Sequence, residues 1–354
     1  MTSFSICIPN FNYAGYIGET IGSALAQPEA TQVLVCDNAS TDGSVDVVRA
    51  IADPRLRLRV NRWNVGFAAN LDRACEGADA DRMILLSSDD LLEAGALATY
   101  ARVAEALGSG ASATVFNSGA HVIDGAGRRT GKVGFDARIW HGARRDAALE
   151  AAAGAPVWRI DAALLLRNAM LSMRTPFQFA STCYPRSLYE AVEGYAAVRF
   201  FSPDKFFAWK LLGVAAEAIH VDAPLVSYRV HDQNQNAVQK AQRALRHMAD
   251  QYAATFDTPA ELLERAGIDR AALERAFIEQ DVALRGMKFV AEGNRSEARR
   301  GLAFGKAAYP RLARSNARVQ ALRALLAAGP AGTGLARIAM RRALARWRDT
   351  PAAP

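Results

Sequence analysis

The first hundred residues alternate short apolar runs with longer segments whose apolar residues recur at helical spacing. Four apolar runs are predicted strands: Phe4 to Ile8, Gln32 to Cys36, Arg57 to Val60 and Met83 to Leu86. Helices are predicted between them, at Gly18 to Ala26, Ser44 to Ala52 and Phe67 to Gly77. This strand-then-helix repeat predicts the α/β class, a Rossmann-like, mostly parallel sheet flanked by helices.

Polar residues follow each of the four predicted strands. They are Pro9-Asn10-Phe11-Asn12 after the first strand, Asp37-Asn38 after the second, Asn61 and Asn64 after the third, and Asp89-Asp90 after the fourth. Ligands of open α/β sheets bind beyond the carboxyl ends of the strands. We therefore expect these polar groups to converge on one crevice.

The adjacent carboxylates Asp89 and Asp90 predict a metal-diphosphate site. Hard oxygen ligands suit Mg²⁺ or Mn²⁺, and these ions also bind phosphate oxygens. The alternative is a helix start, because Asp is common at an N-cap and in a first turn. The glycine-lined phosphate cradles of dinucleotide and P-loop sites are missing from the sequence, so a metal would meet the phosphate charge. Asp37 would remain free to accept a hydrogen bond from a base or sugar.

Six segments, in order, resemble glycosyltransferase family 2, which has the GT-A fold. They span about residues 4 to 236, and the chain matches them with SICIPNFN, VLVCDNASTDGS, NVGFAANLDRA, LLSSDDLL, GYAAVRFFSPDKFFAWKL and APLVSYRVHDQNQN. The sequence departs from the family pattern at Ser87, where an acidic residue is frequent, and at Pro203, where an acidic pair is common. An ordered set of this kind is a much more specific signal than any single motif.

The resemblance implies a role for individual residues. Asp204 would be the catalytic base, and Asp90 and His231 would hold the Mg²⁺ or Mn²⁺ that bridges the two phosphates. Pro9 and Phe11 would line the base, Asp37 would read its edge, and Asp89 would lie near the ribose and diphosphate. The complete set expected around the nucleotide-sugar is Pro9, Phe11, Asn12, Asp37, Asn64, Gly66, Ser88, Asp89 and Arg229.

The chemistry of sugar transfer points to the same residues. A base must take the proton of the attacking hydroxyl, and a positive charge must meet the departing diphosphate. A single displacement predicts inversion at the anomeric carbon, whereas a second carboxylate acting as nucleophile would give retention. Asp222 and Asp232 are the other carboxylates considered, and both lie beside turn residues. Asp204 is also typical of a helix N-terminus.

Two further groups of side chains are candidates for binding. Arg229 and His231 alternate on one face of an extended segment, so both could point at a diphosphate. The middle of the chain could stack an acceptor on aromatic rings, and the sequence alone does not choose among its candidates. These are Trp158, Arg159, Arg167, Arg174, Phe177 and Phe179.

Length and composition indicate a soluble, cytoplasmic enzyme. The chain has 354 residues, 51% of them hydrophobic, which is enough for a sizeable core. The first apolar run is too short for a secretory signal, and no run is long enough to cross a bilayer. Its four cysteines show no metal-ligand spacing and are expected to be reduced packing residues.

The positive charge is concentrated in a C-terminal extension. From Lys240 onward the chain has 21 Lys or Arg and 11 Asp or Glu. Residues 329–332, Gly-Pro-Ala-Gly, are predicted to break this region before a last amphipathic helix, Leu335 to Arg348. That helix could lie on the anionic inner face of the plasma membrane, or it could be solvated or pack on the protein itself. Nucleic-acid binding is not expected, because the extension has few aromatic residues.

The sequence predicts two regions and one main function. Residues 1–236 would form the catalytic domain, with a nucleotide-sugar half (1–118) and an acceptor half (119–236), and residues 237–354 a basic helical region. We expect an inverting, metal-dependent glycosyltransferase that moves a sugar, most readily from a UDP-sugar, to a glycan or glycolipid hydroxyl in surface polysaccharide synthesis. The alternative is a non-catalytic nucleotide-sugar-binding scaffold. A sugar-1-phosphate nucleotidyltransferase would need a glycine- and arginine-rich loop after the first strand. Donor sugar, acceptor and oligomeric state are not encoded by these motifs.

Overall fold

The computed structural model describes residues 2–195, 203–232 and 243–348. The described chain divides into two compact units. An α/β unit comprises residues 2–166, 175–195 and 203–232, and a helical unit comprises residues 167–174 and 243–348. The predicted boundary between residues 236 and 237 lies outside the described residues.

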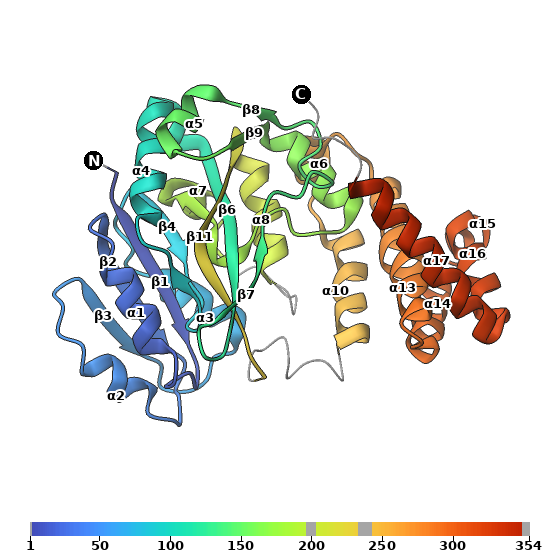
Figure 1. The fold of residues 1–354 in the computed structure, drawn as a ribbon, viewed down its shortest axis with the longest axis horizontal. Helices are drawn as coiled ribbons and strands as arrows, with labels where there is room; N and C mark the ends of the chain where they lie inside the picture. Colours follow the sequence, from blue (N-terminus) through green and yellow to red (C-terminus); the bar gives the residue numbers. More distant parts are fainter. Residues whose placement is uncertain (1, 196–202, 233–242, 349–354) are drawn as a thin grey trace. The chain divides into compact units, whose positions relative to one another are not determined.

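The α/β unit is built on one mixed sheet (Figure 1). In the order β3, β2, β1 and β4, neighbouring strands are parallel, and the antiparallel β10 joins β4 to β6. The path continues through β11, β9 and β8, while β5 pairs with β11 and β7 with β6. The strands are β1 (Phe4–Asn10), β2 (Ala30–Asp37), β3 (Leu56–Val60), β4 (Arg82–Leu85), β5 (Leu91–Leu92), β6 (Thr114–Asp124), β7 (Arg129–Val133), β8 (Arg144–Arg145), β9 (Val157–Asp161), β10 (Cys183–Pro185) and β11 (Glu217–Val230).

Helices connect these strands and cover the sheet. The helices of this region are α1 (Ile17–Leu25), α2 (Ser44–Arg49), α3 (Phe67–Cys75), α4 (Ala96–Leu107), α5 (Ala147–Ala153), α6 (Ala162–Ser172), α7 (Arg186–Ala191) and α8 (Pro203–Val214). Two 3₁₀ turns, η1 (Gly108–Ala113) and η2 (Phe179–Ser181), complete the set. The four predicted strands and three predicted helices are confirmed, and no end is shifted by more than three residues.

The core explains why the apolar runs form these elements. Ile6 and Ile8 of β1, Val33 of β2, and Ile17 and Ile21 of α1 belong to one buried cluster. Burying a side chain of this size stabilises a fold by about 1.5–3 kcal/mol. The apolar faces of β1 and β2 therefore fix α1 on the sheet, and the polar residues that follow these strands lie at its carboxyl edge.

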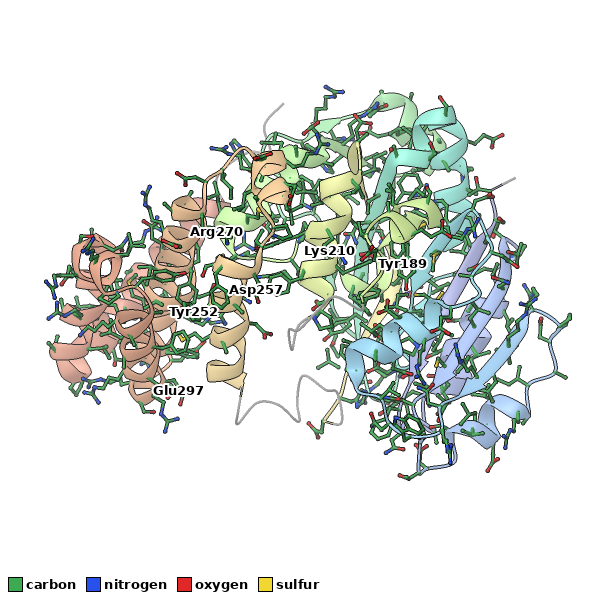
Figure 2. The ribbon with its side chains drawn as sticks, turned by 180° about the vertical axis from the view of Figure 1, so that it is seen from behind. Tyr189, Lys210, Tyr252, Asp257, Arg270 and Glu297 are labelled. Atoms are coloured by element: carbon green, nitrogen blue, oxygen red, sulfur yellow. The ribbon has the colours of Figure 1, made fainter. Side chains whose placement is uncertain are left out.

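The helical unit packs around an aromatic cluster. Tyr252 on α10, labelled in Figure 2, lies 6.0 Å from Phe277 and 5.6 Å from Phe304, measured between ring centroids. A Cβ on Gly305 would lie 2.7 Å from Val282, so this glycine allows close helix packing. The helices are α10 (Arg243–Asp257), α11 (Ala260–Ala266), α12 (Arg270–Phe277), a π-helical turn η3 (Ile278–Leu284), α13 (Arg285–Ala291), α14 (Arg295–Ala308), α15 (Pro310–Ser315), α16 (Ala317–Ala327) and α17 (Gly329–Arg348).

The last helix begins earlier than the sequence predicts. α17 begins at Gly329, so the predicted break at residues 329–332 is wrong in its extent. Gly329 has a left-handed φ of 62° and supplies the turn by itself. Pro330 is tolerated in the first turn, because its missing N–H would have no partner there. Side chains from Arg342 to Arg348, part of the predicted amphipathic face, lie outside the described residues.

Two composition-based expectations can be compared with the structure. Cys7, Cys36, Cys75 and Cys183 are buried and free, which confirms them as packing residues. Among the described residues, no helix is both long and apolar enough to span a bilayer.

Candidate active site

The loops after β1 and β2 are joined through Asp37. Its buried carboxylate accepts hydrogen bonds from Asn10 Nδ2 (2.7 Å), the Ser40 amide (2.8 Å) and Ser40 Oγ (2.6 Å). Oδ1 accepts one of these bonds and Oδ2 the other two, so acceptance of a further bond from a base or sugar stays a prediction. Asp37 fixes the shape of the carboxyl edge.

Asn12 turns the loop that carries Phe11. Its φ of 59° is left-handed, a conformation that Asn tolerates better than most residues. The Asn12 amide donates to Ser40 Oγ (2.9 Å), and Asn12 Oδ1 accepts from the Thr41 amide (2.8 Å). Phe11 is exposed beside it, and Pro9 is half-buried in β1 opposite Cys36. Phe11 is thus available to a ligand at this edge, whereas the main-chain N–H and the Oδ1 of Asn12 bind the loop after β2.

A second set of hydrogen bonds holds the loop between β3 and α3. Asn38 Nδ2 donates to Asn64 Oδ1 (2.9 Å) and to the Gly66 carbonyl (3.3 Å). Asn38 Oδ1 accepts from the Val65 amide (2.9 Å) and from Asn61 Nδ2 (3.0 Å). Gly66 has a φ of 87°, which favours glycine. Sequence reasoning assigned Asn64 and Gly66 to the nucleotide and missed Asn38, although its place directly after Asp37 was a signal.

The Asp89-Asp90 turn follows β4 and contacts the end of β11. Asp90 Oδ1 accepts a hydrogen bond from the Arg229 amide (2.8 Å), and Asp89 Oδ2 lies 3.1 Å from His231 Nε2. Ser88, Asp89 and Asp90 are all buried. The predicted metal ligands were Asp90 and His231, yet the residue that His231 contacts here is Asp89. The pairing of β11 with β5 brings these segments together.

Arg229 supports this turn from inside the protein. Its side chain is only 1% exposed, and its Nε donates to the Asp89 carbonyl (2.8 Å). Nη2 donates to Glu19 Oε2 (2.6 Å), and the guanidinium lies 5.0 Å from the ring centre of Tyr16. A direct contact of Arg229 with a diphosphate, as expected from the sequence, does not fit this enclosed position. Arg229 holds the Asp89 main chain and has the geometry of a positioning residue.

Burial raises the pKa of both aspartates. It raises the pKa of Asp90 well above the usual range of a carboxyl group, and the neighbouring negative charge of Asp89 adds to this effect. Burial also raises the pKa of Asp89, while its hydrogen bond to His231 acts in the opposite direction. Two ionised carboxylates at this turn are therefore costly without a nearby cation.

The donor set fits a divalent cation that also binds a ligand. Ligands on adjacent corners of an octahedron, each about 2.1 Å from the metal, are separated by about 3 Å, which resembles the spacing of Asp89 Oδ2 and His231 Nε2. Among the described residues, no three carboxylate, imidazole or thiol side chains form a group that could hold a metal alone. Mg²⁺ is commonly held by one or two carboxylates together with substrate phosphates, so oxygens of a bound diphosphate would complete this set.

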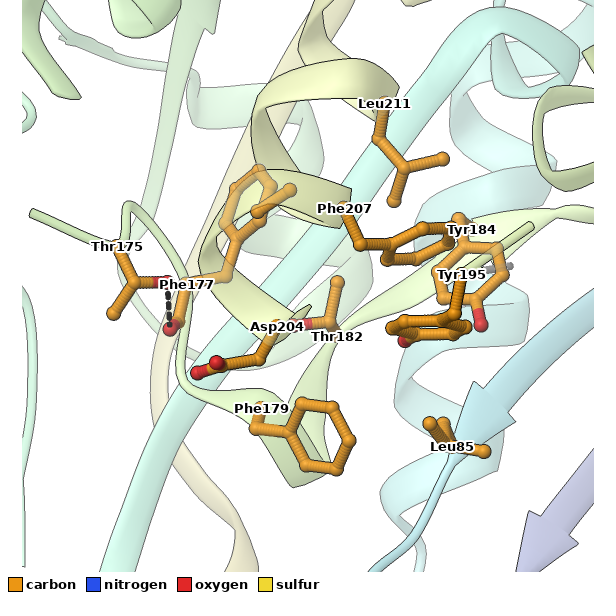
Figure 3. Close-up of a pocket in the computed structure, with 11 residues that line it drawn as sticks. Leu85, Thr175, Phe177, Phe179, Thr182, Tyr184, Tyr195, Asp204, Phe207 and Leu211 are labelled. Carbon is orange, nitrogen blue, oxygen red and sulfur yellow. Dashed lines mark hydrogen bonds between the residues drawn. The ribbon is translucent and has the colours of Figure 1, made fainter. Parts of the chain in front are cut away.

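Asp204 lines a small pocket in the same unit (Figure 3). It lies in the first turn of α8, after Pro203, so it is a helix N-terminal residue and a pocket residue at once. Leu85, which ends β4 shortly before Asp89, lines the same pocket. The cavity volume is about 20 Å³, enough for a single water molecule. The other lining residues are Thr175, Phe177, Phe179, Thr182, Tyr184, Tyr195, Phe207, Ala208 and Leu211.

Comparison with known proteins identifies this region. Residues 5–121 match the family described as Glycosyl transferase family 2. These residues belong to glycosyltransferase family 2. The family 2 region contains Asp37, Asn64, Gly66, Asp89 and Asp90, whereas Asp204, Arg229 and His231 lie beyond the matched residues.

Several curated proteins resemble this family 2 region. The succinoglycan biosynthesis protein ExoU of Rhizobium meliloti (strain 1021) is 39% identical over 98 residues, which cover 27% of this chain and 29% of ExoU. The Escherichia coli UDP-Glc:alpha-D-GlcNAc-diphosphoundecaprenol beta-1,3-glucosyltransferase WfgD is 33% identical over 88 residues, covering 25% of this chain and 35% of WfgD. The matched part is thus about a third of the length of these relatives.

Solved structures resemble this chain over a longer range. TarS 1–349 of S. aureus in complex with UDP-GlcNAc has a TM-score of 0.61 at 16% identity, covering 96% of this chain and 92% of that chain. The mannosyltransferase PcManGT of Pyrobaculum calidifontis, in complex with GDP-Man and Mn²⁺, has a TM-score of 0.51 at 17% identity, covering 95% and 87%. The fold is therefore GT-A, as the sequence predicts.

Some site residues of this GT-A fold had no local sequence signal. Glu19 and Tyr16 come from the start of α1, yet both contact Arg229 near the end of β11. Of the aromatic candidates in the middle region, Phe177 and Phe179 line the Asp204 pocket. Trp158 instead stacks on Phe135, with ring centroids 4.3 Å apart, so it is a packing residue.

Proposed function

We propose that this protein is an inverting glycosyltransferase. It transfers a sugar from a UDP-sugar to a hydroxyl of a glycan or polyprenyl-diphosphate-linked glycan, in the synthesis of a surface polysaccharide. One observation carries the proposal: Asp204 and Leu85 line the same pocket, and Leu85 is the last residue of β4, shortly before Asp89 and Asp90 in the chain. The proposed proton acceptor, Asp204, thus shares a pocket with the end of β4, and the proposed diphosphate-binding turn follows that strand.

The named relatives support the choice of donor and acceptor. WfgD and the Escherichia coli protein WfaP, 32% identical over 91 residues, are both named as UDP-Glc transferases acting on a diphosphoundecaprenol-linked sugar. TarS has been solved with UDP-GlcNAc and with UDP. The names of WfgD and WfaP thus support both a UDP-sugar donor and a lipid-linked acceptor, and the TarS structures support the donor alone.

The donor site comprises the carboxyl ends of β1 to β4. Phe11 contacts the base, and Asn64 and Gly66 border the nucleotide. Asp37 acts by joining Asn10, at the end of β1, to Ser40, in the loop after β2. Asp89, Asp90 and His231 are the residues that would hold Mg²⁺ or Mn²⁺. When bound, the ion would offset the negative charge of the leaving diphosphate.

Asp204 removes the proton of the acceptor hydroxyl. The hydroxyl oxygen then forms its bond to the anomeric carbon on the face opposite the diphosphate, and the bond from that carbon to the diphosphate oxygen breaks, which inverts the configuration. Asp222, considered as a nucleophile, is not beside a turn as predicted. It lies inside β11, next to a register shift, and its amide donates to the Pro156 carbonyl.

Peripheral attachment at the cytoplasmic face of the membrane is part of the proposal. α17 exposes the apolar side chains Leu335 and Ile338, and Arg337 and Arg341 are exposed on the same helix. Basic helices with exposed apolar residues bind anionic lipid surfaces.

A donor panel tests the proposal. Thermal shifts are measured with UDP-, GDP-, dTDP- and CMP-sugars, each with and without Mn²⁺, and release of nucleoside diphosphate is followed with lipid-linked acceptors. We expect one nucleotide class to stabilise the protein by about 2.7 kcal/mol at a hundred times its dissociation constant. Asp204→Asn should keep this stabilisation and lose about 10²- to 10⁴-fold in turnover.

The outcomes separate the enzyme from a scaffold. Donor binding without turnover in the unmodified protein, with Asp204→Asn unchanged in every cellular phenotype, would support a non-catalytic nucleotide-sugar-binding scaffold. A product with retained anomeric configuration would contradict the single displacement and redirect attention to a second carboxylate.

A further inference from the structure

The loop between β3 and α3, together with the residue on either side of it, exposes three large apolar side chains. Val60, at the end of β3, is 44% exposed, Trp63 is 59% exposed, and Phe67, at the start of α3, is 42% exposed. We refer to these three residues as the β3–α3 patch. The strand that leads into the patch, β3, is the terminal strand of the sheet path, so none of the described strands pairs with its outer side. Exposed aromatic residues gathered on one loop indicate a contact surface.

The main chain beneath the patch is held in place. Asn38 Oδ1 accepts a hydrogen bond from the Val65 amide, and Asn38 Nδ2 donates to Asn64 and Gly66, as described above. Asn61 is buried and donates to Asn70 Oδ1 (2.9 Å). Because these bonds fix the loop on both sides of Trp63, the exposure of its ring is a property of the folded loop.

The chain segment that carries the patch has only basic charged residues. Residues 54–71 include four Arg and no Asp or Glu. Arg57 and Arg62 are exposed, and within the described part of the chain neither forms an ion pair. The Arg62 guanidinium lies 6.0 Å from the centre of the Trp63 ring. Arg59 and Arg55, in contrast, are paired with Glu76 and Asp53.

We propose that the β3–α3 patch docks on an anionic lipid bilayer. Trp and Phe favour the interface between lipid headgroups and acyl chains, and Arg side chains nearby attract anionic headgroups. This combination, apolar tips on a fixed loop beside unpaired arginines, matches a membrane surface better than a nucleic acid, which would require a broader basic surface. The docking is expected to be weak, because only three apolar side chains take part.

Docking would also orient the donor site. The same loop carries Asn64 and Gly66, which are proposed to border the nucleotide. If the protein uses a lipid-linked acceptor, the patch brings the donor edge of the sheet to the surface that contains the acceptor; this step rests on the proposed function, whereas lipid binding by itself does not.

Vesicle sedimentation tests the patch on the full chain. Vesicles of phosphatidylcholine alone are compared with vesicles that also contain phosphatidylglycerol. We expect binding to the anionic vesicles, at least fivefold weaker for Trp63→Ser/Phe67→Ser and at least threefold weaker for Arg57→Gln/Arg62→Gln. Phe256→Ser is the matched control, because Phe256 is 52% exposed and lies in the helical unit, and it should bind like the unmodified protein.

Three results would overturn the proposal. The unmodified chain could fail to bind anionic vesicles, the double aromatic variant could bind them unchanged, or the loss could occur equally with Phe256→Ser. A thermal shift with UDP-sugar is measured on the same variants. If UDP-sugar no longer stabilised Trp63→Ser/Phe67→Ser while the variant still bound vesicles, the patch would be part of the nucleotide-binding site instead. Absence of glycosyl transfer would contradict the proposed function and leave the vesicle result unaffected.

Discussion

Asp89 and His231 lie 142 positions apart in the chain, and their Oδ2 and Nε2 atoms are 3.1 Å apart in the folded protein. Asp89 follows β4, and His231 follows β11. The same end of β11 supplies the Arg229 amide that binds Asp90. The end of β11, which is distant in the sequence, therefore contacts both aspartates of the Asp89-Asp90 turn. The predictions below test how these contacts affect stability and ligand binding.

Asp90→Asn separates the charge of the buried carboxyl from its shape. The pKa of Asp90 in the folded protein is above its unfolded value of about 3.8, so the folded state binds more protons between these two values. The raised pKa therefore contributes its whole stabilisation at pH values below 3.8, and this contribution is lost as the pH rises through the folded pKa. We expect Asp90→Asn to be at least as stable as the unmodified protein at neutral pH, and to lose stabilisation by Mn²⁺ with donor.

Thermal unfolding with and without Mn²⁺ and UDP-sugar measures this effect. Asp46→Asn is the control, because the Asp46 side chain is 88% exposed and should leave both quantities unchanged. Unchanged metal-dependent stabilisation in Asp90→Asn would exclude this carboxylate from the cation site.

Arg229→Met should destabilise the α/β unit. The substitution leaves the Asp89 carbonyl without the guanidinium and removes the bond to Glu19, so we expect a loss of about 3 kcal/mol in the free energy of unfolding. Urea titration gives this quantity. Arg128→Met is the control, since that side chain is 81% exposed and should change stability by less than about 0.5 kcal/mol. A loss equal to that of the control would show that Arg229 does not support the turn.

His220 should make the protein sensitive to acid. Its side chain is buried, neither ring nitrogen has a hydrogen-bond partner among the described residues, and burial lowers its pKa from 6.5 to about 4. The unfolded state binds more protons between these values, so this contribution to stability is present above pH 6.5 and is lost as the pH falls towards 4. The shift corresponds to at most about 3 kcal/mol.

In His220→Phe the free energy of unfolding should change less between pH 4.5 and 6.5 than in the unmodified protein. Urea unfolding at several pH values measures this. The exposed His141, changed to Gln, is the control and should leave the slope unchanged. A slope that persists in full in His220→Phe would assign the acid sensitivity to other groups.

α17 should contribute to membrane binding through its exposed face. Deleting residues 330–354 would also remove packing, because Ala336 of α17 is buried. Leu335→Ser/Ile338→Ser alters only exposed positions and should weaken binding to anionic vesicles, with turnover of a soluble acceptor unchanged. Equal vesicle binding by the variant and the unmodified protein would remove α17 from the proposal.

Local sequence determined the first half of the α/β unit. Alternating strand and helix periodicities fixed β1 to β4 and α1 to α3, because each apolar run has one face to bury and each break contains turn residues. The parallel arrangement then placed Asp37, Asn64 and the Asp89-Asp90 turn at one edge. Gly329 shows the limit of predicting structure from local sequence. This single left-handed residue separates α16 from α17, whereas the four residues 329–332 were expected to form the break.

Only the tertiary structure decided which side chains contact one another. Asp37 binds Asn10 and Ser40, His231 meets Asp89, and Arg229 is enclosed by Glu19 and Tyr16. These contacts depend on strand order and register, above all on β11 lying beside β5 and β6, and no periodicity in the sequence encodes them. The chain thus carries its fold in local patterns, whereas the geometry of the site arises from pairings between distant strands.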